Sequence, residues 1–119
     1  MNKIDAITSF TRNSMAYGLT VKEACIIVAV AGICANKAAI GLVPEATQAE
    51  VNLMTSMEMR STISRLKFWL EFKRRKTGKV HKSYYWLNAK GIETVNNLLD
   101  FKIIGIQELM DIATYKKQY

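Results

Sequence analysis

The sequence predicts a mainly α-helical domain with one small β-hairpin, and three observations support this fold class. Half of the 119 residues are hydrophobic, which allows one compact core, and the chain is too short for two ordinary domains. Apolar side chains recur at helical spacing over most of the chain. Only the segment KRRKTGKVHKSYYWL loses that period and is rich in strand formers. We therefore expect a single domain over residues 1–119.

Two helices are expected in the first third of the chain. The first covers about residues 3–16. Thr20 is expected to cap the second, because Glu23 follows three residues later as in a capping box. The segment ACIIVAVAGICA in this helix is apolar nearly all round, which is typical of a helix at the centre of a domain. It is shorter than the roughly 20 residues that a membrane span requires, so no membrane partner is expected.

A helix-turn-helix is predicted over about residues 47–73, after a connection with a short extended piece at 39–43. TQAEVNLM begins with a second capping-box signature and predicts a short helix. The break TSME then supplies a threonine or serine that can cap the next helix, over residues 58–72. Two short helices joined by a polar turn form the helix-turn-helix unit.

A β-hairpin, or wing, is predicted over about residues 73–87, with strands at 73–76 and 80–87 around the dipeptide Thr77-Gly78. Side chains alternate along a strand, so Leu87 is expected to point to the core. One face of the second strand is expected to carry Ser83, Tyr85 and Leu87, and the opposite face Lys82, Tyr84 and Trp86.

Asn88 is expected to cap the helix that follows the hairpin, because an apolar stripe begins just after it. This stripe consists of Ile92, Val95, Leu98 and Leu99. A last amphipathic helix is predicted at about residues 106–117. The order of these elements is that of a winged helix-turn-helix domain, and the terminal helices 3–16 and 106–117 are candidates for a homodimer interface.

Positive charge is concentrated in one third of the chain. The formal net charge is +7, but the segment from Arg60 to Lys90 contains ten Lys or Arg residues and one acid, Glu71, which amounts to +9. A localised basic surface is typical of a protein that binds a polyanion. Guanidinium groups, ammonium groups and short hydroxyls meet phosphates and base edges in DNA. The predicted contacts are Arg60, Ser61, Ser64, Arg65 and Lys67 on the helix, and Lys73, Arg74, Arg75, Lys76, Lys79 and Lys82 on the hairpin.

Four stretches resemble the MarR-type winged-helix regulators over roughly residues 19–99: LTVKEACIIVAVAG, TQAEV, RSTISRL and YYWLNAKG. The resemblance implies that Ser61, Thr62, Ser64 and Arg65 lie on a recognition helix in the major groove, and that the basic hairpin touches the DNA backbone or the minor groove. It also implies a homodimer on a two-fold operator, acting as a repressor; the sequence does not identify an effector. The linker NLMTSMEM is one residue longer than the family pattern, a glycine after the recognition helix is missing, and the wing is short.

Other functions remain open at this stage. A winged helix can also serve as a protein-interaction or replication-associated adaptor, although such a face is expected to be apolar with a mixed rim. Tyr84, Tyr85 and Trp86 could stack on single-stranded nucleic acid, but packing of the hairpin explains them better.

The residue types needed for catalysis or metal binding are not gathered in the sequence. His81 is the only histidine, with no second ligand or nucleophile nearby, so neither an enzyme, a metal site nor a cofactor is expected. Cys25 and Cys34 are expected to be buried reduced thiols. The opening MNKIDAITSF lacks the apolar run of a signal peptide, which indicates a cytoplasmic protein.

Overall fold

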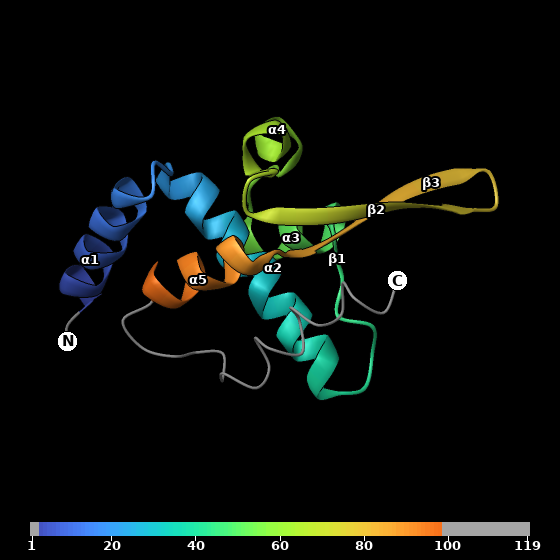
Figure 1. The fold of residues 1–119 in the computed structure, drawn as a ribbon, viewed down its shortest axis with the longest axis horizontal. Helices are drawn as coiled ribbons and strands as arrows, with labels where there is room; N and C mark the ends of the chain where they lie inside the picture. The colour runs from blue at the N-terminus through green and yellow to red at the C-terminus, as the bar shows by residue number, and fades with distance from the viewer. Residues whose placement is uncertain (1–2, 99–119) are drawn as a thin grey trace.

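The computed structural model describes residues 3–98, and helices make up most of this part of the chain (Figure 1). The elements in chain order are α1 (Lys3–Ala16), α2 (Val21–Ala39), β1 (Ala46–Thr47), α3 (Gln48–Thr55), the 3-10 turn η1 (Arg60–Thr62), α4 (Ile63–Leu66), β2 (Leu70–Thr77), β3 (Val80–Leu87) and α5 (Ala89–Leu98). The predicted mainly helical fold with a small hairpin is therefore confirmed. The helix predicted at 106–117, and Leu99 of the apolar stripe, lie outside the described residues.

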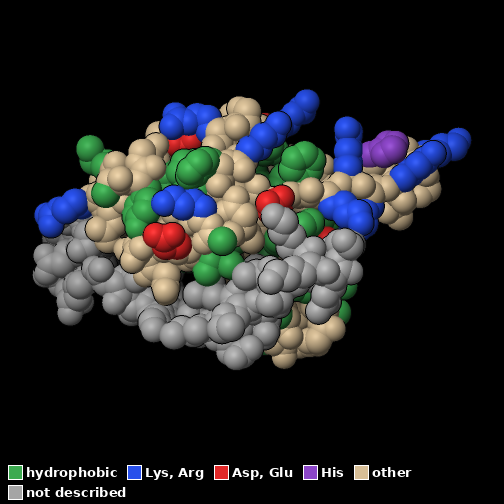
Figure 2. Space-filling view, in the orientation of Figure 1, with side chains coloured by type: hydrophobic (Ala, Val, Ile, Leu, Met, Phe, Trp, Pro, Cys, Tyr) green, Lys and Arg blue, Asp and Glu red, His purple; other side chains and the backbone are tan. Residues whose placement is uncertain are grey.

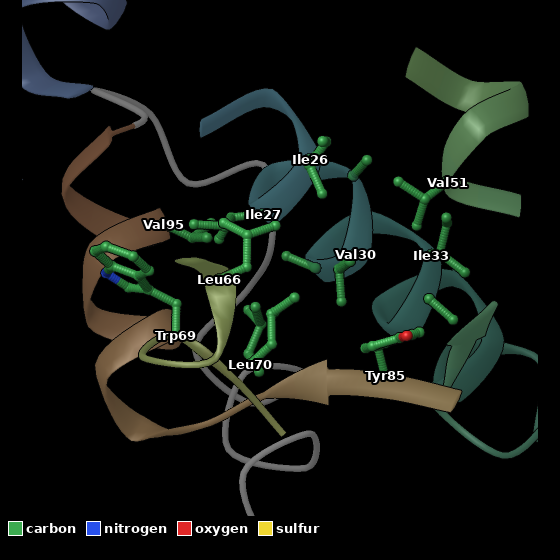
Figure 3. Packing of buried hydrophobic residues seen from close by; sticks show 14 of the residues in the cluster. Ile26, Ile27, Val30, Ile33, Val51, Leu66, Trp69, Leu70, Tyr85 and Val95 are labelled. Atoms are coloured by element: carbon green, nitrogen blue, oxygen red, sulfur yellow. The ribbon is translucent and has the colours of Figure 1, made fainter. Parts of the chain in front are cut away.

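Helix α2 lies at the centre of the fold, as its apolar composition predicts. The predicted capping box is present: the Thr20 hydroxyl accepts a hydrogen bond from the Glu23 N–H (3.1 Å), and the Glu23 carboxylate accepts one from the Thr20 N–H (2.8 Å). Figure 3 shows Ile27, Val30 and Ile33 of α2 among side chains from α3, α4, α5 and the sheet. Burial of this helix on several sides provides the largest contribution of any one element to the core.

The end of α2 differs from the sequence prediction. The helix continues to Ala39, and Gly41 follows in the left-handed region (φ 78°), so the extended piece predicted at 39–43 is wrong. The Leu42 N–H donates to the Lys37 carbonyl (2.8 Å), which closes the last turn. Among residues 3–98 no single helix is long and apolar enough to cross a membrane. One pair, Phe10–Ala16 with Val21–Ala39, meets the length and composition criteria together but is bent by 98°.

Three strands form an antiparallel sheet in the order β1-β3-β2. Strands β2 and β3 pair from Leu70 opposite Leu87 to Thr77 opposite Val80, so the hairpin is longer than the short wing expected from the sequence. The predicted second strand, 80–87, is confirmed, and Leu87 points to the core with 1% of its surface exposed. The sequence does not predict β1, because a two-residue strand is too short to show alternation.

The helix predicted over residues 58–72 is wrong in its length. It begins as the 3-10 turn η1, continues as α4 and ends at Leu66, and from Leu70 the chain is in β2. Leu70 and Phe72 lie opposite Leu87 and Tyr85 on one face of the sheet, and Leu70 is buried there. The sequence from Leu70 fits a helical pattern as well as a strand pattern. Cross-strand packing of aromatic and aliphatic side chains stabilises the strand and decides in its favour.

The turn between α3 and η1 is fixed by side chains. Ser56 ends α3 in the left-handed conformation (φ 56°), so the predicted threonine or serine cap of the next helix is wrong. The Thr55 hydroxyl donates to the Val51 carbonyl (2.8 Å) and accepts from the Met57 N–H (3.1 Å). Asn52 accepts from the N–H of Met59, whose side chain is fully buried. These contacts set the position of η1 and α4 relative to α3.

Asn88 joins the base of the hairpin to α5. Its side-chain oxygen accepts from the Gly91 N–H (2.8 Å), which confirms the predicted cap, and its side-chain amide donates to the Phe68 carbonyl (2.9 Å). Its backbone N–H donates to the Trp69 carbonyl (3.1 Å). Gly91 lies against this carbonyl, so closely that an added Cβ would overlap the Trp69 oxygen. The start of α5 is therefore locked to the start of β2.

We expect Asn88→Ala to lower the free energy of unfolding by about 1–2 kcal/mol, because the change removes the cap and leaves the Phe68 carbonyl without its donor. Denaturant titration measures the loss. Asn96→Ala is the matched control, since Asn96 is exposed on the same helix, and a change within about 0.5 kcal/mol is expected there. Equal losses from the two substitutions would contradict the role of Asn88.

Both cysteines are free thiols, as predicted, but only Cys34 is buried as expected, and Cys25 is half-buried. Burial raises the pKa of Cys34 to about 12, and it also raises the pKa of the half-buried Cys25. The thiolate is the reactive form, so iodoacetamide at about pH 8 is expected to label Cys25 slowly and Cys34 only after unfolding. Intact-protein mass spectrometry with and without denaturant measures this order. Rapid double labelling of the folded protein would show that Cys34 is accessible.

Candidate nucleic-acid interface

Exposed Lys and Arg side chains gather around η1 and α4 and along the β2–β3 hairpin, as Figure 2 shows for one face of the molecule. We call this group the basic surface. Its members, all exposed and all predicted from the sequence, are Arg60, Arg65, Lys67, Lys73, Arg74, Lys76, Lys79 and Lys82. His81 lies on the hairpin among them. The half-buried Glu71 is the one acid of the segment from Arg60 to Lys90.

The strand register distributes the hairpin cations over both faces of the ribbon. Residues that lie directly opposite each other in an antiparallel pair share a face. Arg74 and Lys76 lie opposite Ser83 and His81 on one face, whereas Lys73 and Arg75 lie opposite Tyr84 and Lys82 on the other. The ribbon is therefore positively charged on both sides.

Arg75 is engaged within the protein. It forms an ion pair with the nearly fully buried Glu45, next to β1, and its guanidinium lies 4.9 Å from the centre of the Tyr84 ring. A buried carboxylate requires a partner of opposite charge, so this pair is structural. It connects the hairpin to the segment before β1 and restrains the direction in which the hairpin extends.

A second ion pair fixes the base of the sheet. The Lys37 ammonium donates to the Glu45 carbonyl (2.7 Å) and to the Glu50 carboxylate (2.8 Å), which also accepts from the Thr47 N–H (3.0 Å) in the predicted capping box. Partial burial acts to raise the pKa of Glu50, but the hydrogen bonds from Lys37 and Thr47 outweigh it, so this pKa lies below its ordinary value. Glu50 therefore stays ionised and holds α2, β1 and α3 together.

The polar side chains of η1 and α4 contact the junction between α1 and α2. The Arg65 Nε lies 3.1 Å from the Glu23 carboxylate, and its Nη2 donates to the Gly18 carbonyl (3.2 Å). Lys22, which the sequence reasoning missed, donates to the Ser61 hydroxyl (3.1 Å). The Thr62 hydroxyl donates to the carbonyl of Met59 (2.8 Å), so it serves the local turn.

Ser64 is exposed on α4, next to Arg65 in sequence. Together with Arg60, Ser61 and Arg65 it forms the exposed row of the segment, whereas Leu66 points to the core. The segment thus presents a polar row to solvent and an apolar row to the core over about two turns. Lys22 extends this polar row although it belongs to a distant part of the chain. The amphipathic pattern of residues 60–66 therefore could not have indicated Lys22.

The aromatic residues of β3 pack within the protein, whereas Phe72 of β2 is exposed. Tyr85 and Trp86 are 4% and 5% exposed, and Arg75 covers the Tyr84 ring, so these three side chains offer no open stacking platform. Trp69 is buried, and Phe68 is exposed beside it in an edge-to-face arrangement with ring centres 5.1 Å apart. Phe68 and Phe72 are thus exposed aromatic side chains beside the basic surface.

An open pocket of about 290 Å³ lies where the start of α3 meets the outer part of β3. Its lining residues are Thr47, Gln48, Ala49, His81, Lys82 and Ser83. Within residues 3–98, no group of three or more His, Cys, Asp or Glu side chains is arranged to hold a metal ion. The pocket is an open indentation beside the basic surface.

Comparison with known proteins identifies no relative. No protein-family model, no curated protein and no solved structure matches this chain. The case for a function therefore depends on the arrangement of its own residues.

Proposed function

We propose that the protein is a winged-helix regulator that binds double-stranded DNA, with η1 and α4 in the major groove and the β2–β3 hairpin against the neighbouring backbone and minor groove. The element order and the β1-β3-β2 sheet are compatible with a winged helix. The resemblance to MarR-type regulators in TQAEV, RSTISRL and YYWLNAKG supports the same placement.

The observation that carries this proposal is the presence of cations on both faces of a protruding hairpin. A ribbon that lies flat on a polyanion needs positive charge on one face only. In a groove of duplex DNA the phosphates of two strands flank the ribbon, and charge on both faces is then useful. Each phosphate that a Lys or Arg neutralises releases a counterion, so Lys73, Arg74, Lys76, Lys79 and Lys82 supply affinity for any sequence.

Sequence preference is assigned to the segment from η1 to α4. It is short, but its exposed row presents two arginines and two serines, Arg60, Arg65, Ser61 and Ser64. These groups match the acceptors and donors on base edges in the major groove. We further propose that the protein acts as a homodimer on a two-fold operator and that it represses transcription, as its resemblance to MarR-type regulators implies.

Fluorescence anisotropy tests the proposal with purified protein on random duplexes, on duplexes enriched by selection, and on single strands over a salt series. Duplexes are expected to bind more tightly than single strands, and log Kd is expected to rise with log salt by about 0.9 for each phosphate contacted. A two-fold pattern in the selected sequences is expected for a dimer. No binding even at low salt would reject DNA as the ligand, and an adaptor role would then be the better proposal.

A further inference from the structure

One edge of the Arg65 guanidinium is fixed by the protein. A guanidinium carries five N–H groups in a plane. On one edge, Nη2 donates to the Gly18 carbonyl (3.2 Å), and Nε lies 3.1 Å from Glu23 Oε2. This second contact is an ion pair without a hydrogen bond, since Glu23 Oε2 accepts none among the described residues. No contact in the described part of the chain uses Nη1, and 62% of the side chain is exposed. The edge formed by Nη1 and Nη2, with its two parallel N–H groups, is thus available to a ligand.

Glu23 is a rigid partner for this arginine. Only 2% of it is exposed, and its other oxygen accepts from the Thr20 N–H (2.8 Å) in the capping box of α2. A buried carboxylate that is fixed by a helix cap cannot follow a moving cation, so Arg65 must come to it. The pair therefore restricts the rotamers of a side chain that is otherwise among the most flexible in proteins.

We propose that Glu23 is a positioning residue that orients Arg65 so that its Nη1–Nη2 edge binds the O6 and N7 atoms of one guanine in the major groove. This inference rests on the proposed DNA binding and adds to it a base and a residue that does not touch DNA. Two parallel donors match the paired acceptors of guanine, which is the pattern of bidentate arginine recognition.

A fixed orientation favours a base edge over a phosphate as the ligand of Arg65. Phosphate contacts tolerate variation in direction, and the seven other cations of the basic surface can provide them. A bidentate contact to a base requires a set direction. Orienting the guanidinium before binding removes part of the entropy cost of that contact.

The test is a double-mutant cycle on binding preference, defined as the ratio of Kd on random duplex to Kd on selected duplex. The proteins are wild type, Glu23→Gln, Arg65→Lys and the double variant. Glu50→Gln is the matched control, because Glu50 is also the third residue of a capping box and also pairs with a cation, Lys37. Both glutamine changes remove one negative charge, so their effects on nonspecific attraction are equal.

We expect Glu23→Gln and Arg65→Lys each to lower the preference about tenfold, with the double variant no worse than Arg65→Lys alone. Glu50→Gln is expected to leave the preference unchanged. The base analogue 7-deazaguanine lacks the N7 acceptor. Placed at one position of the selected duplex, it is expected to weaken binding of the wild type by about tenfold. Binding of the Glu23→Gln variant is expected to be insensitive to the same replacement.

An unchanged preference in Glu23→Gln, or losses that multiply in the double variant, would overturn the inference. Equal weakening on all sequences would assign Arg65 to a phosphate and would also overturn it. Thermal melting checks the fold, and Glu23→Asp, which keeps the charge but shortens its reach, replaces Glu23→Gln if that variant does not fold. Failure of the wild type to bind any duplex would reject the proposed function itself, which is a separate outcome.

Discussion

Replacing Gly91 with alanine is expected to lower the free energy of unfolding by about 3 kcal/mol. The added Cβ would overlap the Trp69 carbonyl oxygen and press on Leu87 Cδ2 at 3.2 Å. Neither neighbour can move easily, because the Trp69 carbonyl accepts from the Asn88 N–H and Leu87 is buried in the core. Relief requires α5 to shift from the base of the hairpin. Denaturant titration followed by circular dichroism measures the loss.

Gly32→Ala is the control for this prediction. Gly32 lies inside α2, and a Cβ added there meets nothing within 4 Å. Alanine is the better helix former, so Gly32→Ala is expected to raise stability by up to about 1 kcal/mol. The two changes add the same methyl group with opposite expected signs. A stable Gly91→Ala protein would mean that α5 does not pack on the base of the hairpin in this way.

Removing the charge of the outer hairpin is expected to weaken binding to every duplex by at least about 100-fold at roughly 0.1 M salt. The variant carries Arg74→Gln, Lys76→Gln, Lys79→Gln and Lys82→Gln, which keeps the side chains polar and leaves the Arg75 ion pair intact. The slope of log Kd against log salt is expected to fall by about 3 to 4, since four phosphate contacts are lost. Anisotropy titrations over a salt series measure both effects.

The preference for selected over random duplex is expected to survive in this variant, because base reading is assigned to the segment from η1 to α4. Arg12→Gln with Lys90→Gln is the control, since it removes positive charge from α1 and α5, outside the basic surface. A loss of less than about threefold is expected from that control. Similar losses of affinity in the hairpin variant and in this control would mean that the hairpin acts only through the net charge of the protein and does not contact the DNA.

Short-range signals in the sequence predict much of the fold. The caps formed by Thr20, Thr47 and Asn88 are present as predicted, because each depends on a side chain and a backbone group three residues apart. The boundary after Leu66 is not predictable in this way. The residues from Leu70 fit a helix or a strand by their pattern, and pairing with β3 decides between them.

The candidate site is predicted in composition but not in detail. A count of cations marks residues 60 to 82 as basic, yet it cannot separate Arg75, which pairs with Glu45, from the exposed cations on either side of it. It also cannot link Arg65 to Glu23, or Ser61 to Lys22, because these partners are far apart in the chain. Such long-range pairs form only when the chain folds, so no local sequence pattern predicts them.

The length of the hairpin beyond β1 has a consequence for solubility. β1 pairs with β3 only at Tyr84 and Tyr85, so from Val80 to Ser83 the ribbon has no third strand beside it within residues 3–98. Open strand edges of this kind can join the edges of other molecules and start aggregation. Like charges along both edges oppose such contacts. The cations of the hairpin are therefore expected to oppose edge-to-edge aggregation of the protein. High salt screens their repulsion, so it is expected to promote self-association through this ribbon.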